Sequence, residues 1–153
     1  MKKEIILKNS LNETKGLEQF LESVADLFKI SDVIYANMIT AAMEAFSNAY
    51  FHGNKKDPSK TIRVTFDEQK DYFVLSIKDE GNGFDFEQQL KNIDENNGLF
   101  IILKVCDKVQ FQDNGSLIEM IFYKQALSDG FFDYRKNIIK SSLKHGTKNI
   151  QKS

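Results

Sequence analysis

The chain has 153 residues, of which 41% are hydrophobic and 28% charged, and its formal net charge is −1. These values are ordinary for one soluble globular domain, and the near-neutral charge argues against nucleic acid as the main partner. No apolar run is long enough to cross a bilayer, no signal-peptide pattern is visible, and the single cysteine, Cys106, excludes an intrachain disulfide, so we expect a cytoplasmic protein without membrane contact.

The first part of the chain predicts one strand followed by two helices. Residues 3–8 are short, apolar and β-prone. Apolar side chains recur at helical spacing over 13–29, which predicts an amphipathic helix. Ser31 and Asp32 are good N-cap residues for a second helix, which we expect to run to His52 and to stop at Gly53.

The second part predicts two hairpins separated by a helix. Apolar residues alternate over 62–66 and 73–77 on either side of a turn at 67–71. A glycine-containing loop spans 80–97, and a short apolar helix opens at Gly98, on which Cys106 shares the buried face. The stretch 113–115 reads Asp-Asn-Gly, a strong hairpin signal before a return strand at 117–124.

This order of elements contains more strands than crossover connections. A parallel sheet needs one crossover for each added strand, whereas hairpins give antiparallel pairs. We therefore predict an α/β (α+β) two-layer sandwich, in which a mixed, mostly antiparallel sheet carries helices on one face.

The charge changes after the last predicted strand. Residues 125–153 carry six Lys or Arg and two Asp, so their net charge is 6 − 2 = +4, which leaves −5 for residues 1–124. We assign 1–124 to the single domain and 125–153 to a basic C-terminal extension. Its apolar residues predict an amphipathic helix that ends at Gly146 and packs either on the chain's own sheet or on a partner (Phe131, Tyr134, Ile138, Ile139 and Leu143).

Three polar residues of the second helix, Glu44, Asn48 and His52, are spaced four apart and are expected to lie along one stripe. Four small residues beside the stripe leave space close to the helix (Ala41, Ala42, Ala45 and Ala49). An amide oxygen suits a hard metal ion, and a nearby carboxylate can orient or deprotonate a nucleophile. A stripe facing solvent is the alternative interpretation.

The stretch IKDEGNGFD, residues 77–85, contains a second set of candidates. Asp79 falls on the inward side of its strand, where a carboxylate must find a hydrogen-bond donor. The exocyclic amine of a purine is such a donor. Gly81 and Gly83 allow the backbone to approach a ligand closely, although a plain polar turn explains the glycines equally well.

A third candidate lies at the start of the helix that opens at Gly98. The free backbone N–H groups of a helix start, together with the helix dipole, favour an anion. Most helix starts bind nothing, so this signal gains weight only from the other two.

Taken together, these motifs resemble the four boxes of the Bergerat ATP-binding fold. The boxes are Glu44-x-x-x-Asn48-Ala49, then Asp79-x-Gly81-x-Gly83-Phe84, then Asn97-Gly98-Leu99, and finally Gly115-Ser116. The superfamily includes gyrase and histidine-kinase ATPase domains. Within it, the short length and the N-A-x-x-H-G ending resemble the bacterial anti-sigma-factor serine/threonine kinases, and the resemblance covers about residues 1–124.

The resemblance implies a role for each matched residue. Glu44 would be the general base that activates a substrate hydroxyl, and Asn48 would bind the Mg²⁺ that bridges the phosphates of ATP. Asp79 would bond the adenine amine, with Gly81, Gly83 and Phe84 beside the base. The remaining positions would be the lid over 84–97, the phosphate contacts Asn97, Gly98 and Leu99, and Ser116 near the adenine. His52 is expected to finish the helix rather than to act chemically.

The implied function is an ATP-dependent switch. The protein would sequester a sigma factor and phosphorylate an antagonist protein on Ser or Thr, as a homodimer by family precedent. The lead-in Asn96-Asn97-Gly98 departs from the Gly-Arg-Gly or Gly-Gly type of related kinases. Two alternatives therefore stay open: a nucleotide-binding interaction module without kinase activity, and a stand-alone histidine-kinase-type ATPase domain.

Overall fold

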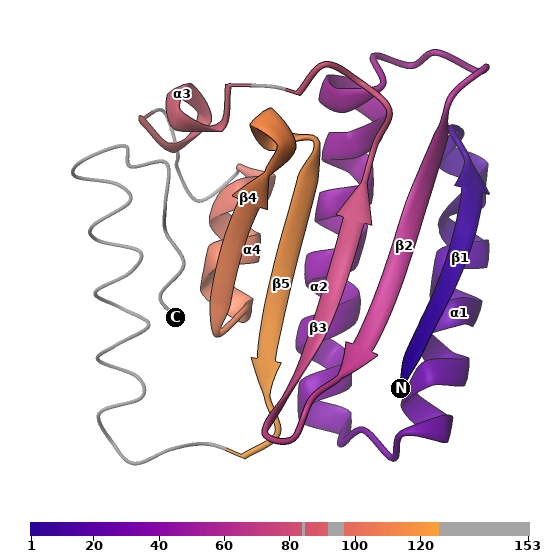
Figure 1. Cartoon of the computed structure of the whole chain (residues 1–153), viewed down its shortest axis with the longest axis vertical. Coiled ribbons are helices and arrows are strands. Elements are labelled where there is room, and N and C mark those ends of the chain that lie inside the picture. The colour runs from indigo at the N-terminus through magenta and orange to yellow at the C-terminus, as the bar shows by residue number, and fades with distance from the viewer. Residues whose placement is uncertain (84, 92–96, 126–153) are drawn as a thin grey trace.

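The computed structural model describes residues 1–83, 85–91 and 97–125. Five strands and four α-helices follow one another along this part of the chain (Figure 1). They are β1 (Lys2–Lys8), α1 (Thr14–Leu27), α2 (Asp32–Asn48), β2 (Thr61–Glu68), β3 (Tyr72–Lys78), α3 (Phe86–Lys91), α4 (Gly98–Val105), β4 (Lys108–Gln112) and β5 (Leu117–Tyr123). The predicted helix at 131–143 and the rest of the C-terminal extension lie outside the described residues.

The strands form a single sheet in the order β1-β2-β3-β5-β4. Every pairing in it is antiparallel, so within the described residues the sheet is antiparallel throughout, where the sequence predicted a mixed one. The outer strands follow the same pattern: β1 pairs antiparallel with β2, and β4 pairs antiparallel with its hairpin partner β5. The predicted two-layer α+β architecture is confirmed.

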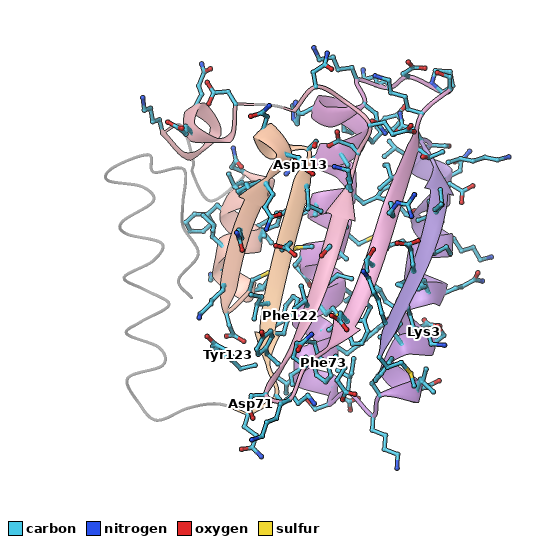
Figure 2. All side chains as sticks on the ribbon, viewed as in Figure 1. Lys3, Asp71, Phe73, Asp113, Phe122 and Tyr123 are labelled. Atoms are coloured by element: carbon cyan, nitrogen blue, oxygen red, sulfur yellow. The ribbon has the colours of Figure 1, made fainter. Side chains whose placement is uncertain are left out.

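Helices α1, α2 and α4 all lie on one face of the sheet (Figure 1). The inward residues of the strands pack against them in one core, whose largest fully buried side chains include Phe46, Phe66 and Phe122. Figure 2 shows Phe73 and Phe122 on neighbouring strands, where the two residues are register partners. Cys106 is 2% exposed, so its predicted place in the core is confirmed.

Helix α2 begins as predicted, but its last part has a different geometry. The hydroxyl oxygen of Ser31 accepts a hydrogen bond from Ile34 N–H at 3.3 Å and caps the helix. After Asn48 the chain continues in a π-helical turn, Ala49–Gly53, closed by a hydrogen bond from Asn54 N–H to Ala49 O at 2.7 Å. This hydrogen bond joins residues that are five apart in the sequence, whereas an α-helical hydrogen bond joins residues that are four apart.

Two connections differ in detail from the prediction. The segment expected to be a loop over 80–97 contains α3, and β2 extends to Glu68, which shortens the predicted turn at 67–71. The Asp-Asn-Gly signal is confirmed, because residues 113–116 join β4 to β5. Asp113, Asn114 and Gly115 have positive φ values of 52°, 59° and 96°, a backbone conformation in which Asn, Asp and Gly are the usual residues.

The core predicts a large cost for one aromatic truncation. Phe66 is 0% exposed, and its ring centroid lies 4.9 Å from that of Phe28 and 5.4 Å from that of Phe73. We expect Phe66→Ala to lower the free energy of unfolding by about 3–5 kcal/mol, because a large cavity forms. Ile6→Ala, at a position 54% exposed on β1, should cost about 1 kcal/mol or less. Denaturant unfolding of both variants checks this, and equal costs would contradict the core described above.

Candidate functional site

Four chain segments that the sequence singled out end or begin at the same side of the molecule. The C-terminal end of α2, the end of β3, the start of β5 and the start of α4 all lie at the top of Figure 1. This follows from the topology: α2 and β3 run toward that side, and β5 and α4 run away from it. Polar residues distant in sequence therefore converge there.

A narrow pocket opens between α2 and the sheet at this side. Helix residues, strand residues and the hairpin line it: Ala45, Asn48, Ala49, Ile77, Asp79, Phe111, Gly115, Ser116 and Ile118. Its volume is about 270 Å³ including the open space at its mouth, and its interior leaves room for about one water molecule. Small-ligand sites usually have about 300–1,000 Å³, so the walls must move apart to admit an organic ligand.

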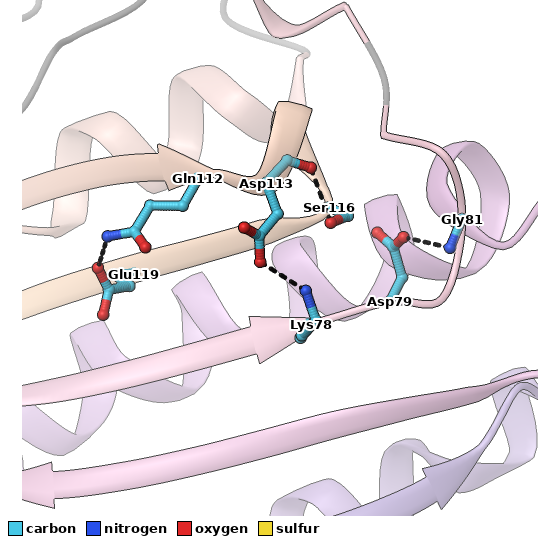
Figure 3. Close-up of polar contacts among 7 residues, drawn as sticks. All are labelled: Lys78, Asp79, Gly81, Gln112, Asp113, Ser116 and Glu119. Carbon is cyan, nitrogen blue, oxygen red and sulfur yellow. Dashed lines mark hydrogen bonds and ion pairs between the residues drawn. The ribbon is translucent and has the colours of Figure 1, made fainter.

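Asp79 is the buried acid of this pocket. It follows the last residue of β3, is 4% exposed, and its Oδ1 accepts a hydrogen bond from Gly81 N–H at 2.8 Å (Figure 3). No hydrogen bond reaches Oδ2 from the part of the chain that the structure describes. Burial raises the pKa of Asp79 above its ordinary value, and the Gly81 bond and the charges of Lys78 and Lys60 offset this only in part. The inward direction predicted for Asp79 is confirmed.

Gly53 and Gly81 have no side chain, so the backbone at these two positions can lie close to the Asp79 carboxylate and to the opposing segment. A Cβ added to Gly53 would lie 2.0 Å from Asp79 Oδ2, and one added to Gly81 would lie 1.9 Å from Gly53 O. Any larger residue would therefore push the end of α2 away from the end of β3. Gly81 is thus required by the contact between two segments of the protein itself, whereas the sequence left open a ligand approach and a plain polar turn.

Glu44 lies beside the start of α4. A Cβ on Gly98 would come within 2.5 Å of Glu44 Oε2, so only glycine fits next to this carboxylate without a shift. Asn97 caps the helix, because its Oδ1 accepts a hydrogen bond from Leu99 N–H at 2.8 Å. The side chain of Leu99 itself is buried in the core. The predicted phosphate-binding end of the site therefore contains the Glu44 carboxylate and the side-chain cap of Asn97.

The predicted stripe of three polar residues on α2 is only partly formed. Glu44 and Asn48 lie one α-helical turn apart, and Asn48 lines the pocket. His52 follows in the π-helical turn, where its side chain is exposed, and it is not among the residues that line the pocket. Of the four small residues, Ala45 and Ala49 line the pocket, but Ala41 and Ala42 are buried in the core instead.

The β4–β5 hairpin forms the far wall of the pocket. Ser116 is 7% exposed, and its hydroxyl donates to Asp113 O at 2.9 Å, while Lys78 forms an ion pair with the Asp113 carboxylate at 2.6 Å (Figure 3). Gly83 has φ of +89°, and a Cβ on it would lie 2.1 Å from Asn114 O. The segment after β3 therefore packs on the hairpin. Phe84 lies outside the described residues.

Several residues of the site were not found by sequence reasoning. Ile77, Phe111 and Ile118 form its apolar walls, and they read in the sequence as ordinary strand residues. Gly53 read only as a helix stop. The described residues contain no cluster of three or more His, Cys, Asp or Glu side chains that could bind a metal ion. In the same part of the chain, no helix is long and apolar enough to cross a membrane.

This combination of fold and site defines a two-layer α+β domain with a small-ligand pocket between a helix and an antiparallel sheet. Residues 7–122 match the model of the histidine kinase-like ATPase domain family. The chain therefore belongs to the histidine kinase-like ATPase domains, a family whose activity implies ATP binding. A comparison with proteins of curated function finds no match to this chain.

Because the pKa of Asp79 is raised, we expect this residue to lower the folding stability in a way that depends on pH. Since the folded-state pKa lies above the ordinary 3.8, the stability that this carboxyl contributes is present below 3.8 and is lost as the pH rises through the raised value. We expect Asp79→Asn, which has the same shape and no charge, to be more stable than the wild type near pH 7. The difference should shrink on acidification, as measured by denaturant unfolding across the pH range.

Asp57 provides a control of the opposite sign. Hydrogen bonds from the hydroxyl and backbone N–H of Ser59 lower the pKa of this exposed carboxyl. Its contribution to stability is therefore present above 3.8 and lost as the pH falls through the lowered value. Asp57→Asn should be less stable than the wild type near pH 7. If both variants shift stability in the same direction, the burial assigned to Asp79 is wrong.

The close contact at Gly81 predicts a strong effect of one methyl group. Gly81→Ala would place Cβ on the Gly53 carbonyl, so the backbone must move, and we expect a loss of about 1–3 kcal/mol of unfolding free energy. Gly16→Ala is the matched control, since its Cβ meets only side-chain atoms, those of Leu7 at 3.3 Å and of Glu13 at 3.4 Å, and no backbone. Within α1, that change should be neutral or stabilising by up to about 1 kcal/mol. Thermal or denaturant unfolding distinguishes the two.

Proposed function

We propose that the protein is an anti-sigma regulatory factor that binds Mg-ATP and phosphorylates an antagonist protein on Ser or Thr. ATP binding follows from the family. The serine/threonine specificity, the sigma factor and the antagonist rest on the sequence resemblance and on the arrangement of residues at the site. A cytoplasmic location belongs to the same proposal.

The observation that supports nucleotide binding best is the state of Asp79. One oxygen of this buried carboxylate has no donor within the described chain, and the residue lines a pocket with apolar walls. An unpaired buried acceptor is costly unless a ligand supplies the missing donor. The exocyclic amine of adenine is such a donor.

The residues near the start of α4 fit the phosphate end of ATP. Asn48 offers an amide oxygen at the pocket, one turn from the Glu44 carboxylate. Mg²⁺ usually takes one or two protein oxygens and fills its remaining positions with phosphate oxygens and water, so the single amide ligand of Asn48 fits this cation. When bound, Mg²⁺ would neutralise charge on the phosphates. Phosphoryl transfer needs little else from the protein beyond positioning and a base.

Glu44 is the residue in this arrangement that fits the role of base. Its carboxylate lies against Gly98, at the helix start where the terminal phosphate would bind. From that position it would accept the proton of an incoming serine or threonine hydroxyl. Its one-turn spacing from Asn48 keeps the base next to the cation that orients the phosphates.

A second candidate function, nucleotide binding without transfer, is favoured by a specific contact. The Asn97 side chain already accepts the hydrogen bond from Leu99 N–H, one of the helix-start donors that a phosphate would use. A carboxylate beside the same helix start also repels phosphate unless a cation lies between them. Either effect would weaken the contact between the start of α4 and the phosphates, and it would leave the binding of the base unchanged.

Phosphate transfer to a partner tests the proposal. Mg-ATP with a labelled γ-phosphate is incubated with the chain and with candidate antagonist proteins encoded by neighbouring genes. Acid-stable label on a serine or threonine of a partner is the expected result. Acid-labile label would indicate histidine-kinase-type chemistry instead. ATP binding without any transfer would favour the second candidate.

The role of Glu44 predicts a separation of binding from transfer. Glu44→Gln should bind ATP with a Kd within a few-fold of the wild type and transfer phosphate about 10²–10⁴-fold more slowly, because a general base is lost. Glu22→Gln, an exposed acid on α1, should change neither quantity. Calorimetric titration and the labelling rate measure both, and an unchanged rate in Glu44→Gln would remove Glu44 from the mechanism.

A further inference from the structure

A buried amide lies directly behind the wall of the pocket and is not among the residues that line it. Asn54 follows Gly53 and is 0% exposed. Its backbone N–H closes the π-helical turn by donating to Ala49 O. Buried amides are costly unless every polar group is bonded, so the partners of this side chain show what it stabilises.

Each polar group of the Asn54 side chain has a partner in a different segment. Its Oδ1 accepts a hydrogen bond from Glu80 N–H at 2.8 Å. Its Nδ2 donates to Thr61 O at 2.9 Å and to Asn9 Oδ1 at 3.1 Å. Because a backbone N–H can only donate and a carbonyl can only accept, the orientation of the amide is determined by these contacts.

Asn9 extends the same network to the neighbouring loop. It is 4% exposed, its Nδ2 donates to Asp57 O at 2.8 Å, and its backbone N–H donates to Lys60 O at 3.2 Å. The two amides therefore join the segment after β1, the end of α2 and the loop that leads into β2. Through Glu80 they also join the residue that directly follows Asp79.

Two consecutive residues, Gly53 and Asn54, contact two consecutive residues of another segment, Asp79 and Glu80. Gly53 packs against the carboxylate of Asp79, and Asn54 accepts the hydrogen bond from the N–H of Glu80. This double contact joins the Asp79 carboxylate and the backbone of Glu80 to the π-helical turn, while Gly81 N–H bonds Oδ1 of the same carboxylate. The Glu80 carboxylate accepts hydrogen bonds from Thr61 as well, so a second, exposed attachment remains if Asn54 is changed.

We infer that Asn54 is a positioning residue that aligns Asp79 for recognition of the exocyclic amine of the base. This inference rests on the proposed nucleotide function, since it concerns the same pocket. Asn54 acts through Asp79 and does not itself contact the ligand. Its contribution therefore appears in the preference for a base with an amine at position 6, rather than in nucleotide affinity as a whole.

Two nucleotides that differ only in that amine test the inference. Calorimetric titration gives the Kd for ATP and for purine riboside triphosphate, which lacks the 6-amine. The wild type should prefer ATP by about tenfold or more, the size of one hydrogen bond to a charged group. Asn54→Ala should lose most of this preference through weaker ATP binding, while its Kd for the amine-free nucleotide stays within about twofold.

Val24→Ala is the matched control for an effect on stability alone. Val24 is 1% exposed in α1, and its apolar side chain takes no part in the hydrogen bonds of Asn54 and Asn9. Its truncation should lower the unfolding temperature and leave the ATP preference unchanged. All titrations are run at a temperature where circular dichroism shows each variant folded. If Asn54→Ala does not fold, Asn9→Ala removes one partner of the Asn54 amide and should reduce the preference to a smaller extent.

The possible results separate this inference from the function on which it rests. If the wild type prefers ATP and the Asn54 and Asn9 variants keep the same preference, Asn54 has no positioning role, and nucleotide recognition by Asp79 stands. If the wild type binds neither nucleotide, or binds both equally, the proposed base recognition itself is refuted and the positioning role with it. A preference lost in the Asn54 variant and kept in Val24→Ala supports the inference.

Discussion

The whole site depends on placing a carboxylate, Asp79, in the interior at the point where a strand and a helix converge. Burial disfavours its charge, and only a backbone N–H two residues later bonds it within the described chain. Two glycines make the arrangement possible, because Cβ atoms at Gly53 or Gly81 would occupy the space of the carboxylate or of the opposing backbone. An apolar residue at position 79 would avoid this cost of burial, and the proposed nucleotide function would account for the carboxylate.

The segments around this carboxylate are held by specific contacts on three sides. On one side lies α2 with the buried amide network of Asn54 and Asn9. On another lies the β4–β5 hairpin, which is tied to β3 by the ion pair between Lys78 and Asp113. The start of the segment after β3 packs on the hairpin through Gly83. A site that must distinguish one base from another benefits from such pre-organisation, since little conformational entropy is then lost on binding.

The two ends of the site differ in character. The end near Asp79 is buried and apolar, whereas the end near α4 is half-exposed and contains a carboxylate, Glu44, close to a helix start. A helix start favours anions, and so it favours Glu44 in the same way as it would favour a phosphate. In the proposed function, a bound nucleotide would bring like charges together at this end, and a divalent cation at Asn48 would relieve that repulsion. Recognition of the base and binding of the phosphates would then take place at physically separate ends of the site.

The sequence by itself determined most of the elements, though not α3 or the π-helical turn, because local signals are sufficient for them: period-2 strands, the Ser31 cap, the Asp-Asn-Gly turn and the inward phase of Asp79 are properties of neighbouring residues. It also predicted most of the polar candidates, since their types and spacings carry chemistry. Only the tertiary structure decided which of them meet. His52 is exposed and does not line the pocket, Ala41 and Ala42 are buried in the core, and Asn54 has hydrogen-bond partners up to 45 residues away in the sequence. Hydrogen-bond geometry and packing between distant segments leave no local pattern, so such contacts can be read only from the fold.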